Sequence, residues 1–256
     1  MQGVRALPTG LGTVRSGRLL PWSAIGLLLA LLLLELLSGT VQPTRTLSLA
    51  AGHDFDVYLD AARRWMSGAG FYEPYQLAGP YRVVEREILY PPILLPLLLP
   101  FLWLPALLWW LIPLGILTAI VVSWRPGLWA IAGIVLCLTI PTVYDSSWSQ
   151  ILIASGNPVI WIAAFVALAT RWPIFGPFAL LKPTPLLVPF ALVGVRRQAW
   201  WVGMVVLGLI SLAFLPMWFE YVTVVLNARG VSWTYALSSV PLVAIPVLAW
   251  RGRHGH

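Results

Sequence analysis

The chain has 256 residues, of which 59% are hydrophobic and only 10% are charged. A soluble domain of this size could not bury that much apolar surface, because roughly half of its residues must face water. The formal net charge is +7, but the basic residues stand in short clusters between apolar runs, which argues against a nucleic-acid-binding surface and is typical of cytoplasmic membrane edges. The composition therefore predicts an all-α, polytopic membrane protein.

The first apolar run covers residues 19–37 and follows Arg5, Arg15 and Arg18. Basic residues ahead of a span favour a cytoplasmic N-terminus, and no small-residue cleavage site follows, so an uncleaved anchor is predicted. We expect a cytoplasmic tail over 1–18, a single transmembrane domain over 19–250, and a cytoplasmic C-terminal tail over 251–256.

A polar external loop is predicted over 38–90, and it holds six of the nine acidic residues. Within it, residues 56–67 have the spacing of an amphipathic helix that lies flat on the membrane, with Gly68 and Gly70 ending it. Val57, Ala61 and Trp65, joined by Tyr58, Ala62 and Met66, form the expected apolar face. On the polar face, Arg63 and Arg64 are expected to meet Asp60 or lipid phosphates.

Apolar runs continue to the end of the chain, and together they predict seven or eight hydrophobic helices. The run over 93–104 is too short for a comfortable span and can be re-entrant. Residues 144–157 are expected to form a loop. The apolar runs cover 93–104, 106–123, 127–143, 158–170, 173–181, 186–195, 200–214 and 236–250.

Lys182, Pro183, Thr184 and Pro185 divide two short apolar arms of roughly 9 and 10 residues. Each arm would reach about 15 Å as a helix, which is half a bilayer. Basic residues flank both arms, and the prolines would break a helix between them. The pattern predicts a re-entrant hairpin with Lys182 at its apex, and one continuous, proline-kinked span is the alternative.

The clearest candidates for chemistry are Asp54 and Asp56, directly after the first span. A carboxylate at this point could act as a general base that deprotonates a sugar hydroxyl. Aspartate at the start of a helix also commonly caps it, and spacing alone favours capping.

Five short motifs occur along the chain in a fixed order. They are Asp54-Phe55-Asp56-Val57-Tyr58 with Ala61-Ala62, Gly68-Ala69-Gly70-Phe71-Tyr72, Leu89-Tyr90-Pro91-Pro92, Gly156-Asn157, and Leu181-Lys182-Pro183-Thr184-Pro185 with Arg196-Arg197. This series, over roughly residues 54–200, resembles glycosyltransferase family 87, the α-mannosyltransferase group of the polytopic GT-C superfamily.

The resemblance implies an inverting transfer of a mannose- or arabinose-type sugar from a polyprenyl-phosphate donor. The acceptor would be an extracytoplasmic glycolipid or glycan, and the protein a multi-pass protein of the cell membrane with its active site on the outer face. Asp54 matches the family's catalytic aspartate, and Asp56 is the reserve.

A departing phosphate needs cations, and Lys182, Arg82 and Arg86 are the candidates for binding it. A lysine that snorkels to an interface is the alternative for Lys182. The two arginines could instead pair with Glu85, Glu87 or lipid headgroups.

Sugar or acceptor contacts are expected from side chains around the predicted base. Tyr58, Tyr72 and Tyr90 could stack on a sugar, although interfacial anchoring explains tyrosines equally well. The other two candidates are Asn157 and His53. No cluster of His, Cys or carboxylates demands a metal, so no cofactor is expected, although some GT-C relatives use a divalent ion.

Two other interpretations stay open from the sequence. A small membrane transporter or lipid flippase would favour inverted repeats and polar residues at mid-membrane, and no repeat is visible here. A non-catalytic, truncated GT-C homologue would keep the fold without the activity.

Overall fold

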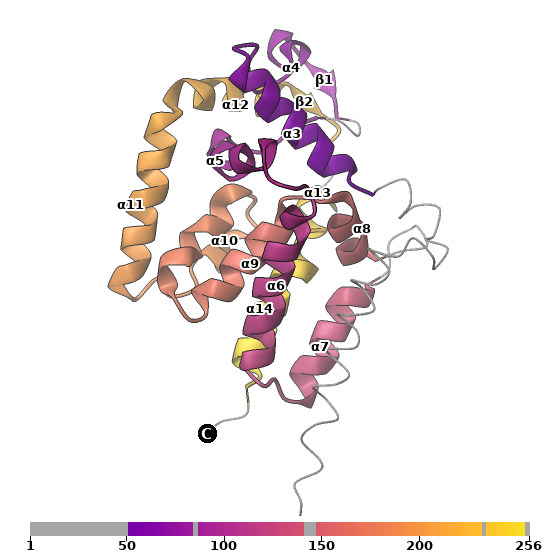
Figure 1. The fold of residues 1–256 in the computed structure, drawn as a ribbon, viewed down its shortest axis with the longest axis vertical. Coiled ribbons are helices and arrows are strands. Elements are labelled where there is room, and N and C mark those ends of the chain that lie inside the picture. The colour runs from indigo at the N-terminus through magenta and orange to yellow at the C-terminus, as the bar shows by residue number, and fades with distance from the viewer. Residues whose placement is uncertain (1–50, 84–86, 141–146, 232–233, 254–256) are drawn as a thin grey trace, which may run out of the picture.

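A computed structural model of the chain describes residues 51–83, 87–140, 147–231 and 234–253. The predicted N-terminal tail over 1–18, the first span over 19–37, residues 254–256 of the predicted C-terminal tail, and Arg86 lie outside these residues. Arg251, the first residue of that tail, is the last residue of α14 (Val240–Arg251). The described chain is mostly helical, which confirms the all-α prediction (Figure 1). A two-stranded parallel pairing of β1 (Tyr81–Arg82) with β2 (Ala228–Arg229) is an addition that the sequence did not predict.

One end of the molecule is built by α3 (His53–Met66), α4 (Pro74–Ala78), the two strands, and α12 (Leu215–Asn227) (Figure 1). The amphipathic helix is confirmed and ends at Ser67, before Gly68, which adopts a φ of 82°. Its buried face is rotated from the predicted one: Phe55 and Leu59 are buried, whereas Met66 is 52% exposed. The buried residues of α3 lie between Phe55 and Ala62, whereas the last turn of the helix is not buried.

The short apolar run after Tyr90 forms three brief pieces, which are η2 (Pro92–Leu94), α5 (Leu95–Leu98) and η3 (Leu99–Leu102). Prolines at 92, 96 and 100 recur every fourth residue and interrupt regular α-helical bonding. Leu94, Leu95 and Leu98 are 0% exposed, so this run belongs to the core of the protein.

The central bundle consists of α6 (Leu108–Ser123), α7 (Leu128–Thr139), α9 (Val159–Ala169) and α14 (Val240–Arg251). In it α9 packs on both α6 and α14, and α14 packs on α7. Two short helices, α8 (Trp148–Ser155) and α13 (Thr234–Leu237), lie at the end of this bundle that faces α3 (Figure 1). The expected loop over 144–157 is therefore wrong for its second half. Ser147 and Gln150 form a capping box that starts α8.

The predicted hairpin around Lys182 is confirmed as a reversal of the chain. Its arms are η4 (Pro173–Leu181) and α10 (Val188–Ala191), which pack against each other. The open ends also meet, because a Cβ placed on Gly194 would lie only 2.6 Å from the Cβ of Pro173. A continuous kinked span is therefore wrong, since it would carry these two residues apart.

The hairpin packs against α11 (Gln198–Ala213), which is followed by α12. Among the described residues, no helix by itself has the length and apolar character to cross a membrane. Two sharply bent pairs could do so on length and composition: α8 with α9, bent by 106°, and α11 with α12, bent by 86°. The sequence analysis missed α12 as an element.

Candidate active site

Asp54 lies in the first turn of α3 but does not cap the helix. The N-cap residue is Gly52, and no side chain caps this end. The N–H of Gly52 donates to the carbonyl of Ala154 at 2.8 Å, which fixes the start of α3 against the end of α8. Asp54 Oδ2 accepts two hydrogen bonds from the same region, from Ser155 Oγ at 2.8 Å and Asn157 Nδ2 at 2.7 Å. The capping interpretation is therefore wrong for Asp54.

The turn between α8 and α9 presents both donors to this carboxylate. Gly156 stands between them with a φ of 71°, a left-handed conformation that favours glycine. A Cβ at Gly156 would lie 2.7 Å from the Trp110 ring and 2.8 Å from the Cβ of Phe55. The sharp bend thus needs glycine, and it points Ser155 and Asn157 toward α3.

Asn157 continues the hydrogen bonding away from Asp54. Its Oδ1 accepts from the hydroxyl of Tyr90 at 2.7 Å and from the N–H of Val159 at 3.1 Å. Tyr90 is 0% exposed, and the ring of Tyr58 packs edge-on against it with the centroids 5.2 Å apart. A chain of hydrogen bonds therefore runs from the carboxylate of Asp54 through Asn157 to Tyr90.

Lys182 lies on the other side of Tyr90 and is 2% exposed. Its Nζ donates to Ser239 Oγ at 2.9 Å and to the carbonyl of Tyr235 at 3.2 Å. The same Nζ stands 3.8 Å from the centroid of the Tyr235 ring and 5.6 Å from that of Tyr90. Tyr90 thereby connects Lys182 to Asp54, because its hydroxyl donates to Asn157, which in turn donates to Asp54. Asp54 and Lys182, 128 residues apart in the chain, thus belong to one polar cluster inside an apolar core.

The structure brings together five of the predicted site residues: Asp54, Tyr58, Tyr90, Asn157 and Lys182. Tyr72 lies behind them, and its hydroxyl donates to the carbonyl of Tyr90 at 2.9 Å.

The other predicted site residues lie elsewhere. Asp56 is exposed on α3, Arg82 is exposed on β1 opposite Arg229, and His53 is half-buried at the start of α3. Arg86 is outside the described residues. Of the two predicted phosphate-binding cations that the structure describes, Lys182 therefore accompanies Asp54 and Arg82 does not.

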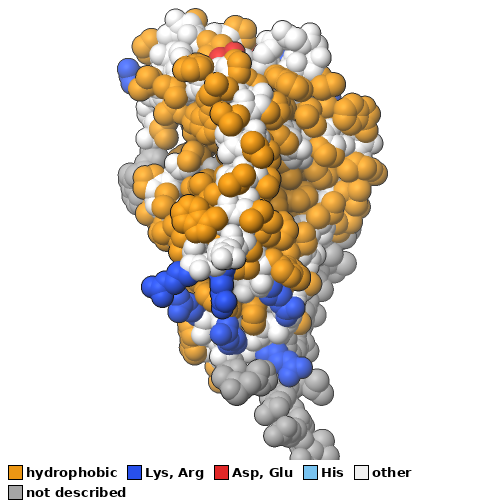
Figure 2. Space-filling view, turned by 90° about the vertical axis from the view of Figure 1, so that its left-hand side faces the viewer, with side chains coloured by type: hydrophobic (Ala, Val, Ile, Leu, Met, Phe, Trp, Pro, Cys, Tyr) orange, Lys and Arg blue, Asp and Glu red, His pale blue; other side chains and the backbone are white. Residues whose placement is uncertain are grey.

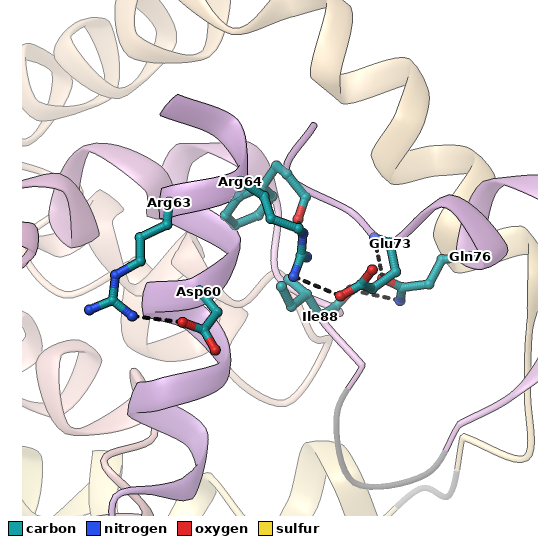
Figure 3. A network of polar contacts seen from close by, with 7 residues as sticks. Asp60, Arg63, Arg64, Glu73, Gln76 and Ile88 are labelled. Carbon is teal, nitrogen blue, oxygen red and sulfur yellow. Dashed lines mark hydrogen bonds and ion pairs between the residues drawn. The ribbon is translucent and has the colours of Figure 1, made fainter. Parts of the chain in front are cut away.

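The arginines of α3 form ion pairs away from this cluster (Figure 3). Arg63 pairs with Asp60 at 2.7 Å, as predicted, on the exposed side of the helix. Arg64 does not meet Asp60. It pairs with Glu73 at 2.6 Å and donates to the carbonyl of Phe71 at 3.0 Å, which ties α3 to the segment that leads into α4.

Sequence reasoning missed three members of the cluster: Ser155, Tyr235 and Ser239. Ser155 was placed in an expected loop, although the Ser147 to Gln150 capping signal would have placed it at the end of a helix. The i, i+4 spacing of Tyr235 and Ser239 was a usable signal, since it puts two polar side chains on one face just where the last apolar run begins.

Hydrogen bonds from the described residues reach only one of the two oxygens of the Asp54 carboxylate. Both donors to Asp54 reach Oδ2, and no hydrogen bond from the described residues reaches Oδ1. Two donors on one oxygen fix the plane of the carboxylate, and the other oxygen can then accept a proton from a substrate hydroxyl.

Comparison of the chain with known protein families, with curated proteins and with solved structures found no match. Membership in glycosyltransferase family 87 therefore stays a prediction, which rests on the sequence motifs of the chain alone.

Proposed function

We propose that the chain is a membrane glycosyltransferase that moves a mannose- or arabinose-type sugar from a polyprenyl-phosphate donor to a glycolipid or glycan acceptor. The observation that supports this most is the position of Asp54. Its carboxylate is oriented by Ser155 and Asn157. The buried Lys182 stands over the ring of Tyr90, whose hydroxyl donates to the same Asn157. An inverting transfer needs one base and a positive charge near the leaving phosphate.

In the proposed reaction, the acceptor hydroxyl gives its proton to Asp54 Oδ1 as its oxygen forms a bond to the anomeric carbon of the sugar. The bond from that carbon to the phosphate oxygen breaks, and the polyprenyl phosphate leaves with the electron pair. Attack from the face opposite the phosphate inverts the anomeric centre. Only one carboxylate is required, because the phosphate leaves without being protonated.

Lys182 contributes through its charge in this mechanism. Two of its three protons are donated to Ser239 and Tyr235, and the Tyr235 ring covers the Nζ at 3.8 Å. In a low-dielectric core, an ammonium still stabilises negative charge that develops some ångströms away. Direct contact with the phosphate would require the Tyr235 ring to move aside.

The surface of the molecule supports a position in a membrane. Along α11 and α12, large apolar side chains are exposed, among them Trp201 at 60%, Leu209 at 61% and Phe219 at 70%. Figure 2 shows this apolar face, with Lys and Arg side chains gathered at one end of the molecule. A soluble protein rarely exposes so large a continuous apolar surface, whereas the interior of a bilayer favours it.

The test is the replacement Asp54→Asn, with Asp56→Asn as the matched control. Both changes remove one carboxylate from the first turn of α3, but Asp56 is exposed and lies outside the cluster. With radiolabelled polyprenyl-phosphate mannose and arabinose as donors, we expect Asp54→Asn to lose about 10²-fold or more of the transfer rate. Asp56→Asn should retain its rate.

Membrane insertion and the unfolding temperature of both variants should match the unaltered protein. Undiminished transfer by a correctly folded Asp54→Asn variant would contradict the proposed role. If the unaltered chain transferred sugar from neither donor, the proposed enzymatic activity would be contradicted.

A further inference from the structure

A second polar region lies at the opposite end of α6 from the Asp54 cluster. Trp110, in the first turn of α6, donates its indole N–H to the carbonyl of Ile153 in α8, close to Asp54. The helix has 16 residues, so its other end is about 24 Å away at 1.5 Å per residue. There the structure has a cavity of about 1030 Å³.

Four arginines, each next to the end of a different helix, line this cavity. Arg125 follows α6, Arg171 follows α9, Arg197 precedes α11, and Arg253 follows α14. Figure 2 shows basic side chains gathered at this end of the molecule. The cavity is therefore formed by tertiary structure, since no single stretch of sequence supplies its charge.

Three of the four segments, those that carry Arg125, Arg171 and Arg253, are joined by hydrogen bonds. The N–H of Gly127 donates to the carbonyl of Gly252 at 2.7 Å, next to a backbone bridge between Pro126 and Arg253. The indole N–H of Trp124 donates to Thr170 Oγ1 at 2.9 Å, which joins the ends of α6 and α9. This part of the rim is thus held in place by main-chain hydrogen bonds and one half-buried side-chain hydrogen bond.

The positive charge of the cavity is not neutralised by the parts of the chain that the structure describes. Ion pairs within those ranges join Arg63 to Asp60 and Arg64 to Glu73. Both arginines belong to α3, at the other end of the molecule. The guanidinium groups of Arg171 and Arg253 instead stand 5.2 Å and 5.3 Å from the ring of Trp124. Both guanidinium groups thus lie near one aromatic ring, and an anion bound in the cavity would offset their positive charge.

Arginines at cytoplasmic turns also follow from the rule that orients membrane helices. That rule needs only basic residues near the membrane edge, and Arg196 and Arg251 satisfy it without lining the cavity. It does not account for a cavity that is lined by arginines from four separate segments of the chain. A bound group is a better explanation for the cavity than orientation alone.

We propose that this cavity binds the phosphate headgroup of an anionic membrane lipid. Guanidinium forks match phosphate oxygens in a bidentate manner, and basic pockets between membrane helices on this side favour such headgroups. The volume is at the upper end of ligand pockets, about 300–1,000 Å³, so it exceeds what a free phosphate ion fills. Ala169, Pro173 and Val193 supply apolar wall against which a glycerol backbone can lie.

The test compares two double variants that lose the same charge at the same end of the molecule. Arg171→Gln with Arg253→Gln removes two cavity arginines, and Arg196→Gln with Arg251→Gln removes two neighbours outside the cavity. Affinity of the full-length protein in detergent is measured by native mass spectrometry for phosphatidylglycerol, for phosphatidylcholine, and for inorganic phosphate. Sugar transfer is not measured, so the result is independent of the proposed enzymatic activity.

We expect the unaltered protein to bind phosphatidylglycerol more tightly than phosphatidylcholine. The cavity variant should lose about tenfold of that affinity and the control less than about twofold. Should the first pair fail to fold, Arg125→Gln with Arg197→Gln removes the other two cavity arginines with the same expectation.

Equal losses in cavity and control variants would reduce the effect to diffuse surface charge and overturn the proposal. It would also be overturned if inorganic phosphate bound as tightly as phosphatidylglycerol, because the ligand would then be a free phosphate.

Discussion

At the scale of single residues, Asp54 and Asp56 show how two identical side chains acquire different surroundings. Each residue of an α-helix is rotated by about 100° from the one before it, so a separation of two places the side chains on nearly opposite faces. Asp54 faces the turn between α8 and α9, and Asp56 is exposed. Sequence spacing alone could not separate base from cap, because either role fits an aspartate in a first helical turn.

The tyrosine hydroxyl groups of the cluster also differ, in whether they are hydrogen-bonded. Tyr90 donates to Asn157 at 2.7 Å, whereas the buried hydroxyl of Tyr235 has no hydrogen-bond partner among the described residues. Behind them, burial and then the neighbouring Tyr221 raise the pKa of Tyr72 above its ordinary value. The Tyr72 hydroxyl therefore stays protonated and remains a donor to the carbonyl of Tyr90.

Removal of the hydroxyl group should therefore lower the stability of the fold at Tyr90 but not at Tyr235. Tyr90→Phe should lower the free energy of unfolding by about 1 kcal/mol, because it removes a buried hydrogen bond and leaves Asn157 Oδ1 with one donor. Tyr235→Phe should leave that free energy unchanged or raise it slightly, since no bond is lost. Thermal unfolding of the two purified variants in one detergent gives the comparison, and equal destabilisation would refute the assigned hydrogen bonding.

At the scale of elements, the Lys182 hairpin is held by glycines where backbones approach closely. Gly203 on α11 is buried, and a Cβ there would overlap the carbonyl of Ile174 in η4. A Cβ at Gly208, five residues later on the same helix, would meet no other atom within 4 Å. Small residues at such contacts let helices pack closely.

Replacing each glycine by alanine should therefore have opposite effects. We expect Gly203→Ala to destabilise the fold by about 2 kcal/mol, because the backbone of η4 must shift. Gly208→Ala should be neutral or stabilising by up to about 1 kcal/mol, since alanine favours the helix. Denaturant unfolding in mixed micelles measures both, and a Gly203→Ala variant as stable as Gly208→Ala would contradict the close packing of α11 on the hairpin.

The sequence predicted elements well where one physical signal dominates. Apolar runs located α6, α7, α9, α11 and α14, and the prolines around Thr184 located the hairpin. Two of the longer helices, α8 and α12, were not predicted because they lack such a signal. In α8 the apolar pattern is short and its capping box was overlooked, and α12 mixes Glu220, Tyr221 and Asn227 with apolar residues.

The site was predictable to a similar degree. Asp54, Asn157 and Lys182 stood in recognisable motifs. The spacing of Tyr235 and Ser239 could have placed them on one face, but it could not show that Lys182 lies against them. No pattern in a single chain reports that approach, because it depends on how α14 packs against α9 and α7.

At the scale of the whole molecule, the two ends differ in charge and in proposed surroundings. The α3 end carries the acidic side chains of the Asp54 region, and the other end carries the four cavity arginines. The proposed orientation puts the first end outside the cell and the second in the cytoplasm. This asymmetry can be tested without any assay of function.

The chain has one cysteine, Cys137, which is buried, so Cys137→Ala gives a background for site-directed labelling. On this background, Ala69→Cys at the α3 end should react with a membrane-impermeant maleimide in intact cells. Arg251→Cys at the opposite end should react only after permeabilisation. Labelling of both positions from outside would exclude the proposed orientation, and reaction of the background itself would show that the replacement of Cys137 was incomplete.

The contact between Lys182 and Ser239 also has a consequence for how the protein is made. Ser239 follows the lysine by 57 positions, which at about 5–20 residues per second is a delay of several seconds during translation. Until Tyr235 and Ser239 have left the ribosome, the ammonium has neither of its final acceptors and should not enter an apolar environment. The hairpin is therefore expected to reach its final position late, and a chain that ends before Tyr235 would lack both acceptors of Lys182.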